Sequence, residues 1–134
     1  MRRSVFAIFV GWIGTALFVS LVNLIVSYLF FGTAQAPTID LETVTSTYLA
    51  TSFIGGLLAS ASGGYLTARL ASKAGLAHAL ILALIHLLLA IPVIWFGPGA
   101  SAGQPAWYPI FTAIPGIGGA IVGGLVWHYL LRGE

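Results

Sequence analysis

The sequence IGGLLASASGGYLTAR, residues 54–69, carries small residues four apart on two neighbouring helical rows. One row is Gly55, Ala59 and Gly63, and the other is Gly56, Ser60 and Gly64. In water, each interior glycine would destabilise a helix by about 1 kcal/mol relative to alanine. In lipid, small residues let another helix approach closely. The stretch therefore predicts a membrane helix that packs against its neighbours on both rows.

The composition of the 134-residue chain excludes an ordinary water-soluble protein. Hydrophobic residues make up 59% of the sequence and charged residues only 6%, whereas about a quarter of the residues of a soluble domain are charged. The net charge of +2 includes no basic run, so nucleic acid is not an expected partner. The absence of cysteine excludes disulfides, thiolate metal sites and thiol catalysis.

Four long apolar segments predict a single-domain, all-α integral membrane bundle. They cover residues 4–31, 46–70, 76–96 and 109–131. Each exceeds the ~18 apolar residues that indicate a membrane-spanning helix. For the first segment the alternative is a cleaved signal peptide, with Arg2 and Arg3 before the apolar run and Ala34-Gln35-Ala36 after it. That run is longer than the ~7–15 residues of a signal peptide, so a retained helix is expected.

Charged residues predict the orientation of these helices. The basic residues all fall on one side of the predicted bundle: Arg2, Arg3, Arg69, Lys73 and Arg132. Asp40 and Glu42 fall on the other side. Because cytoplasmic loops of membrane proteins carry an excess of Lys and Arg, both termini are expected in the cytoplasm.

An internal match in the sequence suggests two tandem helical hairpins. A shift of 63 positions places Gly55-Gly56 on Gly118-Gly119 and Asn23 on His86. Parallel repeats of this kind occur in some transporters. Chance alignment of helices rich in Gly and Ala explains the match equally well.

Glycines in the second and fourth segments are the predicted helix-packing residues: Gly55, Gly56, Gly63, Gly64, Gly116, Gly119 and Gly123. The second segment joins the third through a tight turn at residues 71–75. We therefore expect its glycine rows to pack against the third helix and against the glycines of the fourth.

His86 lies near the middle of the third segment, on the helical face of Ala79 and Ala83. At equal distance from the tight turn, it is expected opposite Ser60 and Ser62. An ionisable group within the membrane is a candidate functional group. The alternative is a neutral histidine bonded to a serine hydroxyl, a helix contact of roughly 0.6 kcal/mol. Asn23, in the outer half of the first segment, completes this candidate intramembrane polar site.

A second candidate group lies at the predicted cytoplasmic boundary: Arg69, His78, His128 and Arg132. Basic residues in this position can bind an anionic lipid headgroup. The alternative is ordinary anchoring of the helix ends in the interface. His78 and His128 could also hold haem between two helices. No third protein ligand accompanies them, so neither a metal site nor a cofactor is predicted.

The run from Gly63 to Ala71, followed by Ala77-His78-Ala79-Leu80, resembles a pattern in small uncharacterised bacterial inner-membrane proteins. Those proteins are likewise four-helix chains with a glycine-rich last helix. The resemblance covers about a fifth of the chain. It implies a location in the bacterial inner membrane and carries no activity with it.

The sequence favours a non-catalytic, multi-pass membrane protein with a structural or accessory role. No acidic residue lies within the predicted spans, and no glycine-rich phosphate loop follows a strand, so enzyme signals are lacking. The expected partners are the lipid bilayer and either a second copy or another membrane protein. A small channel or facilitator for a neutral or weakly basic solute is the first alternative. A lipid- or haem-binding protein is the second.

Overall fold

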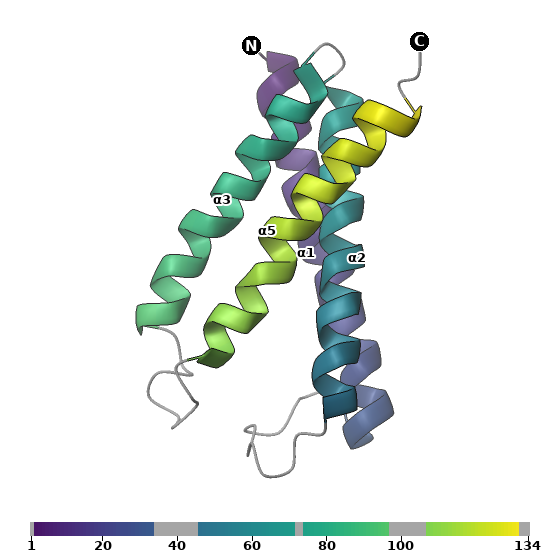
Figure 1. The fold of residues 1–134 in the computed structure, drawn as a ribbon, viewed down its shortest axis with the longest axis vertical. Helices are drawn as coiled ribbons and strands as arrows, with labels where there is room; N and C mark the ends of the chain where they lie inside the picture. Colours follow the sequence, from purple (N-terminus) through teal and green to yellow (C-terminus); the bar gives the residue numbers. More distant parts are fainter. Residues whose placement is uncertain (1, 34–45, 72–73, 97–106, 132–134) are drawn as a thin grey trace.

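The computed structural model describes residues 2–33, 46–71, 74–96 and 107–131, and within these ranges it is helical with no strand (Figure 1). The helices are α1 (Arg2–Phe31), α2 (Ser46–Leu70), α3 (Gly75–Phe96) and α5 (Trp107–Val126). A short π-helix, η2 (Trp127–Leu131), continues α5. All four long helices are long and apolar enough to cross a membrane. The predicted all-α, four-helix class is therefore confirmed.

Local sequence explains where the helices begin and end. Gly32 follows the last residue of α1 with a φ of 69°, and its amide donates to Tyr28 O at 3.0 Å. Glycine adopts this left-handed conformation without the steric cost of a Cβ, so it ends the helix. At the start of α5, Pro109 occupies the first turn, where its missing N–H costs no helical hydrogen bond. This helix begins at Trp107, two residues before the predicted start.

Helix α2 lies between α1 and α5 and makes most of its contacts with these two. Helix α3 packs mainly against α5 and contacts α2 less (Figure 1). The expectation that a glycine row of α2 packs on the third helix is therefore wrong. A tight turn makes α2 and α3 neighbours in sequence, but the bare backbone of α2 is covered by α1 and α5 instead.

The interior of the bundle is built from small residues and the exterior from large apolar ones. Leu82, Ala83 and Ala120 form the buried cluster. Large side chains such as Phe9 and Leu17 on α1, and Leu84 on α3, are exposed. Such an exterior suits a hydrocarbon solvent, in which close packing of small residues brings helices together.

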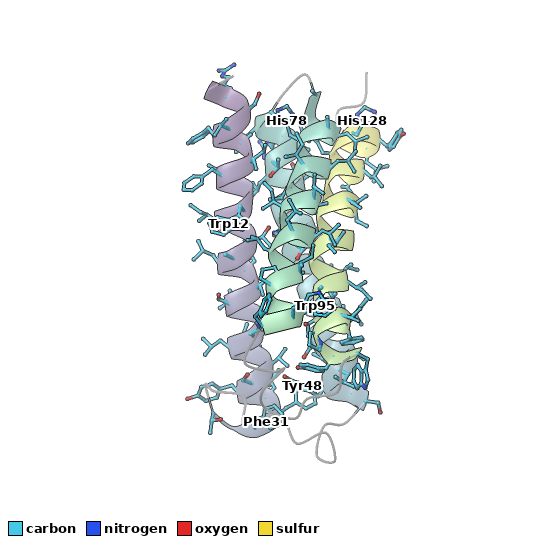
Figure 2. All side chains as sticks on the ribbon, turned by 90° about the vertical axis from the view of Figure 1, so that its left-hand side faces the viewer. Trp12, Phe31, Tyr48, His78, Trp95 and His128 are labelled. Carbon is cyan, nitrogen blue, oxygen red and sulfur yellow. The ribbon has the colours of Figure 1, made fainter. Side chains whose placement is uncertain are left out.

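The two ends of the bundle differ in the side chains that they carry. Figure 2 shows His78 and His128 at one end, and Phe31 and Tyr48 at the other. The start of α1, with Arg3, and the end of α2, with Arg69, lie at the histidine end (Figure 1). We call these the basic end and the Tyr48 end. The loop acids Asp40 and Glu42, and also Lys73 and Arg132, lie outside the described residues.

Candidate functional site

Helices α1 and α2 meet through a reciprocal pair of Gly-x-x-x-Thr segments. A Cβ added to Gly11 would overlap Thr67 Oγ1, and a Cβ added to Gly63 would overlap Thr15 Oγ1. Each added Cβ would also lie 2.8 Å from the carbonyl oxygen of the other glycine. Thr15 Oγ1 donates to Gly11 O at 2.9 Å, which keeps this hydroxyl satisfied within its own helix. The two backbones are thus in direct contact, and no larger residue fits at either glycine.

Helices α2 and α5 meet through the second glycine row. A Cβ on Gly64 would overlap the backbone of Ala120, and one on Gly123 would overlap Ala61 O. A Cβ on Gly119 would lie 2.6 Å from Ser60 Cβ. Gly64, Gly119 and Gly123 therefore serve contacts within this chain.

Two of the predicted packing glycines do not have the expected partners. Gly55 faces Val22 of α1. Gly116 is the exception to the predicted stripe, because a Cβ there would meet no heavy atom within 4 Å. Its backbone contributes in another way: Gly116 O accepts a hydrogen bond from His86 of α3.

The predicted intramembrane polar residues are not joined by hydrogen bonds to one another. His86 Nδ1 lies 3.1 Å from Gly116 O, so the expected serine partner is replaced by a backbone carbonyl. Because a carbonyl can only accept, Nδ1 carries the proton. Ser62 Oγ donates to Ala59 O at 2.6 Å within its own helix. Ser60 Oγ is buried beside α5 without a hydrogen-bond partner. Asn23 lies elsewhere, exposed on α1.

Asn23 lines a cavity of about 640 Å³ between α1, α2 and α5. The cavity reaches the Tyr48 end of the bundle, since Tyr48 forms part of its wall (Figure 2). Its polar lining side chains are all neutral hydroxyls or an amide: Ser20, Asn23, Ser27, Tyr48, Ser52, Tyr108 and Thr112. Three separate helices, α1, α2 and α5, supply these groups.

Aromatic contacts hold the wall of the cavity together. Tyr48 packs edge-on against Phe31 of α1, with ring centroids 5.2 Å apart, and shares a side-chain hydrogen bond with Tyr108 of α5. Phe53 and Phe111 pack between α2 and α5 at 5.2 Å. These contacts join the three helices at the Tyr48 end through large side chains.

The predicted group at the basic end is only partly assembled. His78 Nδ1 lies 2.7 Å from the carbonyl oxygen of Ala74, the residue before α3, and Arg69 is exposed. The His128 ring packs on Tyr129 at 4.7 Å. Figure 2 places both histidines at the same end, and Arg132 lies outside the described residues. Within the part of the chain that the structure describes, no three His, Cys, Asp or Glu residues gather as a metal site would require.

The π-helix η2 adds a buried polar atom at this end. Trp127 packs edge-on against Tyr65 of α2, with centroids 5.8 Å apart. Its Nε1 is buried without a hydrogen-bond partner. Short π-helical turns frequently occur at functional sites.

The sequence groups Asn23 with His86, Ser60 and Ser62, but the structure places it in the cavity with Ser20, Ser27, Tyr48 and Tyr108. Their joint position in one cavity depends on α1 and α5 both packing on α2. No family model matches this chain, and neither a curated protein nor a solved structure matches it.

Proposed function

We propose that this chain is a non-catalytic, multi-pass protein of the bacterial inner membrane, with both termini in the cytoplasm and a structural or accessory role. The close contact between helix backbones toward the basic end supports this proposal most strongly. Gly63 and Gly64 bring the backbone of α2 against α1 and α5. Leu82 and Ala83 of α3 form a buried cluster with Ala120 of α5. Close backbone contacts of this kind suit a protein that supports other components better than one with an open pore.

Any partner subunit, including a second copy, would bind the large apolar faces rather than the glycine rows. The glycine rows serve contacts within the chain, whereas Phe9 on α1 and Leu84 on α3 face outward. In lipid, such faces can associate through side-chain packing.

Photo-crosslinking in native membranes tests the accessory role. A photoreactive residue replaces Phe9 or Leu84 in the full-length chain, and the same substitution at the buried Leu82 serves as the matched control. We expect one protein adduct of discrete mass from an exposed position and none from Leu82. Lipid adducts alone at both exposed positions, together with a monomeric mass in mild detergent, would contradict the proposal.

The cavity at the Tyr48 end favours a second candidate, a facilitator for a small neutral solute. It supplies a neutral polar entrance, and His86 bridges α3 to α5 at Gly116, the residue after the cavity-lining Pro115. Solute flux into proteoliposomes tests this role. A flux that is unchanged by His86→Leu would exclude His86 from the path, and a chain that gives no flux above empty liposomes would exclude the facilitator.

A further inference from the structure

The cavity at the Tyr48 end has the size of a small-molecule site. Its volume of about 640 Å³ lies within the ~300–1,000 Å³ that is usual for ligand pockets. It is bounded by three helices and lies in the outer half of the bundle if both termini are cytoplasmic.

The lining selects against charged ligands. Every described polar group in the wall is a hydroxyl or an amide, and these groups both donate and accept hydrogen bonds. A bound ion is stabilised by a countercharge, which this wall does not offer among its described residues. A neutral ligand rich in hydroxyl groups matches this wall, because each of its hydroxyls can also both donate and accept a hydrogen bond.

Two side chains on the polar face of α1 are accessible to an occupant of the cavity. Asn23 and Ser20 are exposed, and the structure shows no hydrogen bond from either side chain to another described residue. Transfer of an amide without hydrogen-bond partners from water to hydrocarbon costs about 4–8 kcal/mol. On α5, Pro115 has no N–H, so the Phe111 carbonyl one turn earlier lacks its helical donor, and both residues line the cavity. Water or ligand hydroxyls would satisfy these groups.

Aromatic rings from α2 and α5 form part of the cavity wall. Tyr48, Phe53, Tyr108 and Phe111 all line it. An aromatic wall beside hydroxyl and amide groups fits a ring that has an apolar C–H face and a hydroxylated edge. Sugars have this combination.

We propose that the cavity binds a neutral, polyhydroxylated group of the glycosyl or polyol class, either as a free solute or as the headgroup of a glycolipid. The proposal rests on the proposed membrane insertion and also specifies the ligand of the second candidate function. It does not depend on a protein partner.

Binding to the full-length chain in nanodiscs tests the proposal. One set of nanodiscs contains phosphatidylethanolamine and phosphatidylglycerol and is titrated with glucose or glycerol, with binding followed by saturation-transfer NMR. A second set is doped with monoglucosyl diacylglycerol, and native mass spectrometry measures retention of that lipid. We expect saturable binding in at least one set, and the set that binds identifies the source of the group.

Variants locate the site. Ser52→Ala removes one hydroxyl from the wall, and its matched control, Ser62→Ala, removes a hydroxyl that bonds within α2. We expect affinity to fall about two- to tenfold in Ser52→Ala, as for a lost hydrogen bond. Asn23→Leu should reduce it further, and Ser62→Ala should not change it.

The possible failures are distinguishable. A chain that does not enter nanodiscs would contradict the proposed membrane function itself. A chain that enters them but binds neither probe, or whose Ser52→Ala and Asn23→Leu variants bind like the unmodified protein, would overturn the binding site alone.

Discussion

Single glycines in this bundle have different functions although they look alike in the sequence. Gly64 lies against the backbone of Ala120, whereas Gly116 has free space around its Cα and offers only its carbonyl to His86. A methyl group is the smallest probe that distinguishes these two environments.

Gly64→Ala and Gly116→Ala should therefore have opposite effects on stability. The first forces α2 and α5 apart, and overpacking of this kind costs about 1–3 kcal/mol. The second adds no contact and should be neutral or stabilise α5 by up to about 1 kcal/mol. Unfolding in mixed micelles measures both. Equal destabilisation by the two variants would show that α5 does not pack as described.

The protonation of His86 is a second feature of single residues. Its Nδ1 faces the Gly116 carbonyl, so the proton must lie on Nδ1 for the bond to form. We expect ¹⁵N NMR of labelled histidine to show the Nδ1–H form for His86, with His86→Leu used to assign the signal. A signal from the Nε2–H tautomer would disprove the hydrogen bond.

At the scale of the helices, the contact between α1 and α2 is one unit. Gly11 and Gly63 face each other across it, and each accommodates the threonine of the other segment. The first alanine substitution must already separate the helices, because neither backbone carbonyl can move independently of its helix.

Gly11→Ala and Gly63→Ala should consequently be non-additive. We expect each single variant to lower the free energy of unfolding and the double variant to lower it by less than the sum, with a coupling of about 0.5–3 kcal/mol. A double-mutant cycle in micelles measures this coupling. Strict additivity would indicate that the two glycines lie at separate contacts.

Helix bounds could be predicted well from the sequence, because Gly32, Pro109 and the length of each apolar run are local signals. Which helices pack against each other could not be predicted. The turn at residues 71–75 suggested that α2 packs on α3, but which helix covers a glycine row depends on the shapes of all its neighbours. The cavity was missed for the same reason: Asn23, Ser52 and Tyr108 come from three helices and share no spacing in the sequence.

In the described residues, close backbone contacts lie toward the basic end and the polar cavity lies toward the Tyr48 end, and the proposed orientation gives these ends different surroundings. With both termini in the cytoplasm, a fluorescent protein fused after Glu134 should fluoresce. Alkaline phosphatase fused at the same point should be inactive, because it requires the oxidising periplasm. As a control, the same two fusions are placed after Thr33 in chains that contain only α1. There the phosphatase should be active and the fluorescent protein should not fluoresce. An active phosphatase at the C-terminus would contradict the proposed topology.

The contrast between the close contact of α2 with α5 and the open polar cavity is tested most directly by the reactivity of introduced thiols. The chain contains no cysteine, so each substitution creates the sole thiol. In spheroplasts, a membrane-impermeant maleimide should modify Ser20→Cys and Ser52→Cys, which line the cavity, and should leave Ser60→Cys unmodified, because Ser60 is buried between α2 and α5. Modification of Ser60→Cys with protection of Ser52→Cys, or equal reactivity at all three positions, would contradict the account.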